Sequence, residues 1–174
     1  MLFNRLWEMP NPKTFSIKCI AELLQRYITK GMVVVDPFAK DSFWGTITND
    51  LDTESSATHH MSAIDFLDML IKDEVKADVV LLDPPYSPRQ ISECYKSIGL
   101  KVTQTDTQNA RLYKECKDRL MSLLKPSGIA ICFGWNSTGF GKKRGFELLE
   151  ILLVCHGGSH NDTICTVEQY IPMF

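Results

Sequence analysis

Two different periods of hydrophobic residues run along the chain, and together they predict helices that alternate with strands. Three segments place apolar residues at helical spacing, namely 14–28, 63–72 ("AIDFLDMLIK") and 107–124. Between them lie short apolar or β-branched runs of the kind found in buried strands. The predicted strands are 32–36 ("MVVVD"), 46–50 ("TITND"), 77–83 ("ADVVLLD"), 129–133 ("IAICF"), 146–155 and 162–171, with 58–63 ("THHMSA") as a further short candidate.

The order of these elements indicates an α/β fold. Strands separated by helices predict a mainly parallel central sheet with right-handed crossovers. The last two strands are joined only by "HGGSHN" (156–161), which is too short for a crossover helix. We therefore expect an antiparallel hairpin at the C-terminal end of the sheet.

Acidic residues close three of the predicted strands. Asp36 and Asp83 directly follow apolar runs, and Asp50 ends the short run "TITND". In open α/β sheets, ligands bind beyond the carboxyl ends of the strands. The three carboxylates are therefore expected to surround one cleft.

Composition and charge narrow the class of protein. The chain has 174 residues, of which 44% are hydrophobic and 23% charged, and we interpret 1–174 as one globular domain. No apolar run is long enough to span a bilayer, and "MLFNRLWEMPNPK" lacks the apolar core of a secretory signal. With six scattered cysteines and no CxxC pair, the sequence predicts a cytoplasmic protein with reduced thiols. A net charge of −2 means that a nucleic-acid partner would need a local basic patch.

The stretch "VVLLDPPYSPRQ" (79–90) carries the most specific chemistry. A carboxylate followed by two prolines is held extended, because each proline fixes its own φ and restricts the residue before it. The Asp83 carboxylate and the Pro84 carbonyl then offer two acceptors, and Tyr86 offers a flat face. This set suits an amino group on a planar base, which presents two N–H donors and a stacking surface.

The same residues resemble the "DPPY" motif of the amino-methyltransferases, which use S-adenosylmethionine to methylate exocyclic amines of bases, most often adenine in DNA. Further segments resemble the same family: "VVVDPFAKDSFWG" its cofactor loop, "ITNDLD" and "SAIDFL" its next two segments, and "MPNPKTFSIKCIAELL" its N-terminal cofactor motif. "DPPYSPRQISECY" is similar to a phage and prophage subgroup. The resemblance implies a Rossmann-like class I methyltransferase fold that transfers a methyl group to N6 of adenine in DNA.

The resemblance also implies roles for individual residues. The catalytic group would be Asp83, Pro84, Pro85 and Tyr86, with Asp83 and the Pro84 carbonyl accepting the amine hydrogens while Tyr86 stacks on a flipped base. The residues expected to bind the cofactor are Thr14, Phe15, Ser16, Asp36, Pro37, Phe38, Asp50 and Ser62. Lys18 and Asp52 are second choices at that site.

Two features depart from the family pattern. The usual loop reads Asp-Pro-Phe-x-Gly-x-Gly, but this chain has Lys40 and Ser42 there, and its next glycine is Gly45. Ser62 stands where the family commonly has an acid that contacts the adenine of the cofactor. Either a subgroup uses another loop shape, or cofactor binding is weakened, and Ser62 would weaken the contact with the cofactor's adenine.

Few residues outside the catalytic core remain to contact a substrate. No segment is long enough for a separate target-recognition domain, so a homodimer or a partner protein that reads the target is an open expectation. Basic residues beside an aromatic suit contacts with a nucleic-acid backbone. The candidates for substrate contact are Arg89, Gln90, Trp135, Asn136, Lys142, Lys143 and Arg144.

Three alternatives stay open. The same motif could act on adenine in RNA or on N4 of cytosine, because it selects an amine and not a polymer. A catalytically silent relative that only binds nucleic acid is the second, favoured by the loss of the loop glycines. The third is a metal site at Cys155, His156 and His160. This spacing offers three possible ligands and no obvious fourth, so we prefer a polar hairpin tip and predict no metal.

Overall fold

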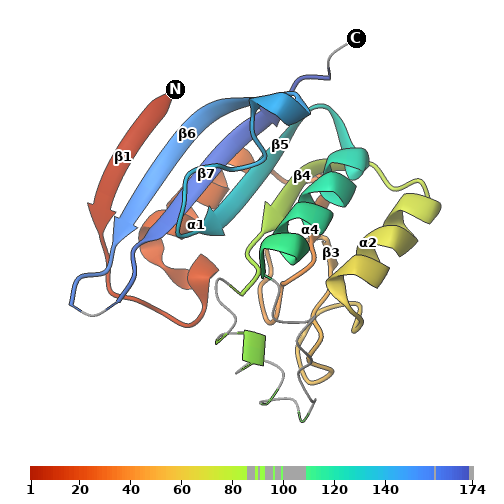
Figure 1. Cartoon of the computed structure of the whole chain (residues 1–174), viewed down its shortest axis with the longest axis horizontal. Coiled ribbons are helices and arrows are strands. Elements are labelled where there is room, and N and C mark those ends of the chain that lie inside the picture. The colour runs from red at the N-terminus through yellow and green to blue at the C-terminus, as the bar shows by residue number, and fades with distance from the viewer. Residues whose placement is uncertain are drawn as a thin grey trace.

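A single sheet of seven strands organises the chain (Figure 1). The structure is a computed structural model that describes residues 1–85, 89, 91, 92, 96, 99, 109–158 and 160–172. The described strands lie in the order β1-β6-β7-β5-β4-β2-β3. Their bounds are β1 Leu2–Trp7, β2 Val34–Asp36, β3 Ile47–Thr48, β4 Ala77–Leu82, β5 Leu124–Gly134, β6 Phe146–Cys155 and β7 Thr163–Tyr170.

The strand directions confirm the predicted topology. β3, β2, β4 and β5 pair in parallel, and β7 is antiparallel to both of its neighbours, β5 and β6. The C-terminal hairpin is therefore present, with β7 inserted between β5 and β6. Since β7 is antiparallel to both neighbours, β6 runs in the same direction as β5. β6 therefore begins at the end of the sheet opposite to the end that carries Asp83.

One strand was not predicted. β1 pairs in parallel with β6, with Leu2 opposite Glu150 and Trp7 opposite Cys155, and forms an edge of the sheet. Most of its side chains are exposed, so it lacks the burial pattern by which strands are recognised. Its place in the sheet comes from backbone pairing.

Helices cover both faces of the sheet. α1 (Lys18–Tyr27) packs on one face, while α2 (Ala63–Lys72) and α4 (Asn109–Leu123) pack on the other (Figure 1). Two short 3-10 turns, η1 (Thr14–Ser16) and η2 (Lys142–Arg144), flank the core. None of the helices that the structure describes combines the length and apolar character needed to cross a membrane.

Some predicted bounds need correction. The helix expected at 14–28 is divided at Ile17, whose extended backbone (ψ 124°) separates η1 from α1. The strand expected at 46–50 is only Ile47–Thr48, and the candidate at 58–63 reduces to one bridge between His59 and Asn49. Both short segments carry polar side chains that bond to each other, such as Thr48 and Thr58, in place of a regular ladder.

The core consists of two apolar clusters, one on each face. Alternation along β4 divides its residues, with Val79 and Leu81 facing α1 while Val80 and Leu82 face α2 and α4. A strand covered on both faces must be apolar throughout, which explains the continuous run that made β4 so easy to recognise. The five cysteines that the structure describes are free, as expected for reduced thiols, and Cys94 lies outside the described residues.

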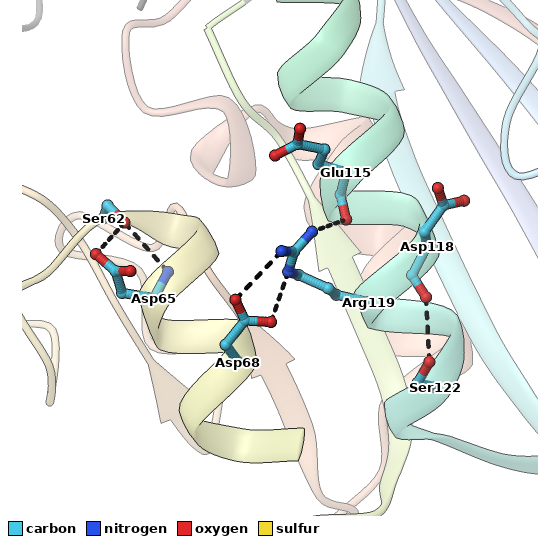
Figure 2. A network of polar contacts seen from close by, with 7 residues as sticks. All are labelled: Ser62, Asp65, Asp68, Glu115, Asp118, Arg119 and Ser122. Carbon is cyan, nitrogen blue, oxygen red and sulfur yellow. Dashed lines mark hydrogen bonds and ion pairs between the residues drawn. The ribbon is translucent and has the colours of Figure 1, made fainter. Parts of the chain in front are cut away.

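α2 and α4 are joined by a polar contact at their exposed side (Figure 2). The guanidinium of Arg119 on α4 donates to both carboxylate oxygens of Asp68 on α2, at 2.7 and 3.2 Å, and also to the Glu115 carbonyl. Beneath this contact, the buried side chains of Phe66, Leu67 and Leu120 pack in one apolar cluster. The ion pair links the two helices at the surface, where such pairs contribute little, so the packing of α2 against α4 depends mainly on the apolar contacts.

Candidate functional site

The carboxyl edge of the parallel strands gathers the predicted acids. Asp36 ends β2, Asp50 follows β3 and Asp83 follows β4, and these three strands are adjacent and parallel. Trp135 follows β5, the next parallel strand. The expectation that Asp36, Asp50 and Asp83 share one edge of the sheet is therefore confirmed.

Asp36 and Asp83 also lie on the same face of the sheet. Val34 and, on β4, Val79 and Leu81 pack into the α1-side cluster. Residues two apart on a strand point to the same side, so Asp36 and Asp83 continue these two rows. Both carboxylates therefore face the side that α1 and η1 cover.

Asp36 is fully buried and only half satisfied. Its Oδ1 accepts a hydrogen bond from the Phe38 N–H at 3.1 Å, while Oδ2 has no hydrogen-bonding partner. Burial raises the pKa of Asp36 to about 8, opposed by the Phe38 hydrogen bond and supported by the negative charges of Asp83 and Asp50. At neutral pH this carboxyl group is largely protonated when nothing positive is near it.

Asp83 is half-buried and directly follows the last residue of β4. Pro84 behind it is buried and Pro85 half-buried, so the proline pair anchors the end of β4. Tyr86, which we predicted to stack on the base, lies outside the described residues, as does Gln90. The part of the catalytic motif that the structure describes is thus Asp83, Pro84 and Pro85.

Tyr113 is a neighbour of Asp83 that the sequence did not single out. Its hydroxyl donates to the Phe133 carbonyl at 2.7 Å, which joins α4 to the carboxyl end of β5. Burial is the main cause that raises the pKa of Tyr113, and the charges of Cys132 and Asp83 add to it. A tyrosine within an amphipathic helix carries no motif, so only the fold could reveal this position.

The loop after β2 is closed by Asp50. The Asp50 carboxylate accepts from the Lys40 N–H at 2.9 Å through Oδ2 and from the Asp52 N–H at 2.9 Å through Oδ1. Lys40 has a φ of 50°, in the left-handed region that favours glycine. Asp50 thus holds the loop that connects it to Asp36, and its predicted contact with the cofactor ribose stays a prediction.

Gly45 provides the close approach that a side chain would prevent. A Cβ atom there would lie 2.6 Å from Thr48 Cγ2 and 3.0 Å from Asp36 Cβ. The loop therefore passes directly over the carboxylate-bearing end of β2. This contact explains how the region keeps Asp36 buried although Lys40 and Ser42 replace the usual glycines.

Asn49 is a second residue that the sequence did not single out. Its amide group donates to the carbonyls of Pro37 at 3.2 Å and Met61 at 3.0 Å, and its oxygen accepts from the Met61 N–H. The Asn49 side chain is buried, and its contact with Pro37 is buried as well, while the two contacts with Met61 are partly buried. Asn49 therefore ties the loop at Pro37 to the segment that leads into α2.

The N-terminal candidates lie at the same edge. Phe15 packs against Phe133 near the end of β5, with ring centroids 4.9 Å apart. Lys13 forms a 3.6 Å ion pair with Asp41 in the loop after β2, which places Thr14, Phe15 and Ser16 beside that loop. The ion pair brings the start of η1 beside the loop after β2, and the cofactor roles of Thr14, Phe15 and Ser16 stay predictions.

Ser62 serves the start of α2. Its hydroxyl oxygen accepts from the Asp65 N–H at 3.1 Å and donates to the Asp65 carboxylate at 2.7 Å (Figure 2). This is the N-cap arrangement that satisfies a free N–H group at a helix start. The cofactor role predicted for Ser62 has no further support, and the residue has a structural task.

The substrate candidates fall into two separate groups. Trp135 and Asn136 follow β5 at the edge that carries Asp83, and Arg89 is exposed on the chain beyond Asp83. Lys142, Lys143 and Arg144 form η2 just before β6, whose first residue lies at the opposite edge of the sheet (Figure 1). The sequence analysis grouped Trp135 and Asn136 with Lys142–Arg144 as neighbours in the chain, but the chain returns along the sheet between them.

The return path is fixed by Glu168 and Asp118. The buried Glu168 carboxylate of β7 accepts from the N–H groups of Phe140 and Gly141, and Arg144 pairs with Asp118 of α4 at 2.9 Å. Phe140 is buried in the cluster beneath α4. These contacts hold the basic turn away from Asp83, so it is not part of the site at the carboxyl edge.

His156, in the connection between β6 and β7, has a structural role. His156 is buried, with Nδ1 2.9 Å from the Glu8 carbonyl and Nε2 2.9 Å from the Thr163 hydroxyl. Both ring nitrogens therefore have hydrogen-bonding partners within the protein. Across the described residues, no group of three or more His, Cys, Asp or Glu side chains is arranged to hold a metal ion.

Comparisons with known proteins give a clear result for the fold. No family model matches the sequence, and no curated protein does. Solved structures do match. SMU.776, a methyltransferase candidate crystallised with SAH, has a TM-score of 0.64 at 11% identity, covering 87% of this chain and 48% of its own. NSun6 from Pyrococcus horikoshii with SFG has a TM-score of 0.60 at 14% identity, covering 88% and 51%.

TrmN from Thermus thermophilus is similar as well, with a TM-score of 0.56 at 18% identity over 89% of this chain and 49% of that one. The chain has the Rossmann-like fold of these methyltransferases. The predicted fold class, including the antiparallel C-terminal hairpin, is thereby confirmed. The chain spans about half the length of these three structures.

Proposed function

We propose that the protein transfers a methyl group from S-adenosylmethionine to the N6 amino group of adenine in DNA. The observation that supports this most directly is the pair formed by Asp83 and Asp36 at the carboxyl edge, on one face of the sheet. Asp83 is half-buried at a strand end that Pro84 and Pro85 stiffen, so its carboxylate and the Pro84 carbonyl keep fixed positions. Two fixed acceptors suit the two hydrogens of an exocyclic amine.

The remaining candidates fit a cofactor beside that amine. S-adenosylmethionine, when bound, supplies an electrophilic methyl group. Phe15 packs on Phe133 at the carboxyl end of β5, Asp36 ends β2, and the unpartnered Oδ2 of Asp36 is an acceptor for positive charge. Two of the similar structures were solved with SAH or SFG, which agrees with a cofactor of this class on this fold.

The chemistry required of the protein is orientation. Asp83 and the Pro84 carbonyl hold the amine so that its lone pair points along the line of transfer, which is positioning and electrostatics with no covalent intermediate. A base inside a duplex must leave its stack to reach this edge. The two acceptors select an amine and do not contact the sugar. Whether the substrate is DNA or RNA is therefore a question for the methylation assay below.

Replacement of Asp83 tests the proposal. We expect Asp83→Ala to lower the methylation rate about 100-fold or more, because an acceptor that orients the reacting group is lost, while affinity for S-adenosylmethionine changes little. Transfer of labelled methyl groups to DNA, RNA and cytosine-rich oligonucleotides measures the first quantity, and calorimetry the second.

The matched control is Glu147→Gln, which neutralises an exposed acid on β6 far from the carboxyl edge. It should behave like the wild type in both assays. If Asp83→Ala lost cofactor affinity as severely as activity, Asp83 would be a structural residue. If the wild type methylated RNA but not DNA, the amine chemistry would stand and the polymer would change.

A further inference from the structure

Two buried acids, Glu150 and Glu168, have hydrogen-bond donors for both carboxylate oxygens. Glu150 accepts from the Arg26 guanidinium, from the Tyr27 hydroxyl at 2.9 Å and from the Asn4 amide at 3.2 Å. Glu168 accepts backbone N–H groups on each of its oxygens. Such pairing is the normal condition for a charge removed from water.

Asp36 is the exception among the three acids that are buried in the described part of the chain. It is as buried as the other two, but Oδ2 has no partner and Oδ1 has only the Phe38 N–H. A buried carboxylate oxygen without a donor is costly, so its retention needs an explanation. No structural task of Asp36 uses that oxygen.

The surroundings of Asp36 make the cost larger. The charged groups that act on it are Asp83, from the end of β4, and Asp50, from the end of β3, and both are acids. Its own loop contributes the Phe38 N–H as the opposing interaction. Among the interactions that shift the pKa of Asp36, none comes from a positive charge, so the unpartnered Oδ2 is an acceptor that a cation would satisfy.

A metal ion does not fit this arrangement. The described residues contain no group of three acids or histidines close enough to share an ion. A larger organic cation can act on several carboxylates at once without bonding to each. The ligand class that matches the site is therefore an organic cation, such as a sulfonium ion.

Resting on the function proposed above, we propose that Asp36 exchanges its proton for the positive charge of the cofactor. The empty site keeps Asp36 neutral; entry of a sulfonium ligand ionises it, and the proton passes to solvent. The site therefore prefers the cationic sulfonium cofactor to the neutral thioether product that remains after transfer. Loss of the positive charge during the reaction then weakens binding of the product.

This coupling has a measurable pH dependence. Affinity for S-adenosylmethionine should rise as pH increases from 6 to 8, by at most about tenfold per pH unit for one exchanged proton. Above the pKa of Asp36, about 8, the rise should level off. Affinity for S-adenosylhomocysteine should follow pH less steeply, because no sulfonium charge is available to stabilise the ionised carboxylate.

Calorimetry tests the inference with the wild type, Asp36→Asn and the control Glu147→Gln. Each is titrated with S-adenosylmethionine and with S-adenosylhomocysteine at pH 7, in buffers of different ionisation enthalpy, to count released protons. The amino groups of both ligands titrate near this range, so the informative quantity is the difference between wild type and Asp36→Asn. We expect about one more proton released by the wild type with the sulfonium ligand, and a preference for that ligand that Asp36→Asn loses.

A second measurement needs no ligand. The unfolded Asp36 ionises at its ordinary pKa near 4, but the folded one only near 8, so between these values the folded state binds more protons. This group therefore makes the wild type less stable as pH rises, by up to tenfold per unit in the unfolding equilibrium constant. Asp36→Asn, which resembles the neutral acid in shape, should lose this slope and match the wild type near pH 4.

The outcomes separate the two proposals. If both ligands bind with equal affinity, with no difference in protons between wild type and Asp36→Asn, the proton exchange is wrong and the methyltransferase proposal survives. If neither ligand binds at any pH, both proposals are wrong. Coinciding stability profiles of wild type and Asp36→Asn would also overturn the inference.

Discussion

Lys40 shows how the loop after β2 manages without its usual glycines. Its backbone has a φ of 50°, which costs an ordinary residue about 1 kcal/mol and glycine almost nothing. The Asp50 carboxylate holds the strained peptide by accepting its N–H. Lys40 thus has a backbone conformation that glycine adopts more easily.

Lys40→Gly should stabilise the protein. Relief of the left-handed strain favours the folded state, and the greater freedom of glycine in the unfolded chain offsets part of it. The free energy of unfolding should rise by up to about 1 kcal/mol, measured by urea denaturation. Lys40→Ala, which keeps the strain, should stay within about 0.5 kcal/mol of the wild type.

Glu74 supplies a matched comparison in another loop. It has a φ of 54° just after α2, away from the carboxyl edge. Glu74→Gly should give a similar gain if backbone conformation is the cause. A loss of stability in Lys40→Gly alongside a gain in Glu74→Gly would show that the Lys40 side chain supports the loop.

Some site residues could be predicted because strand ends fix their place. Asp36 and Asp83 follow apolar runs directly, so the parallel sheet brings them together once the strands are recognised. Tyr113 and Asn49 could not be found in this way. Each acts through contacts between segments distant in the chain, and neither stands in a pattern that marks such a contact.

At the scale of elements, strong periodicity was a reliable guide. The helix predicted at 63–72 and the strand at 146–155 have the observed bounds, because each contributes several apolar side chains to the buried core. β1 was missed because its side chains remain exposed. The basic turn η2 was grouped with the site because the sequence does not show that the chain turns back after β5.

Removal of the α2 cap should have a defined cost. Ser62→Ala leaves the Asp65 N–H without its acceptor, which should lower the free energy of unfolding by about 1 kcal/mol. Ser62→Thr keeps a hydroxyl at the same position and should cost little. Urea denaturation of both variants measures the difference.

The same pair of variants also tests the cofactor role predicted for Ser62. If the hydroxyl only caps α2, affinity for S-adenosylmethionine should be equal in the two variants at a temperature where both are folded. A selective loss of affinity in Ser62→Ala, with stability unchanged, would instead place Ser62 in the cofactor site.

At the scale of the whole molecule, β1 is the least covered part of the sheet. Its outer edge is not paired with any described strand, and Leu2, Phe3 and Trp7 are more than half exposed. We expect its backbone amides to exchange with deuterium at least about 100-fold faster than those of β5 and β7, because few buried contacts oppose its local opening. Hydrogen-exchange mass spectrometry at low protein concentration measures this.

Dependence of the exchange on protein concentration distinguishes two situations. If β1 remains exposed, its exchange rate should not change with concentration. Protection that matches β5 at every concentration would contradict the expectation. Protection that grows with concentration would mean that a second copy covers the free edge, since unpaired strand edges are templates for pairing.

The position of β7 has a consequence for how the chain is made on the ribosome. β7 follows β6 in synthesis but lies between β5 and β6 in the sheet. Until residues 163–170 are synthesised, β1 and β6 cannot join the strands already formed, and the core-facing side chains of β6 stay exposed. Transiently exposed apolar surface of this kind favours aggregation, so the late arrival of β7 lengthens the exposed period.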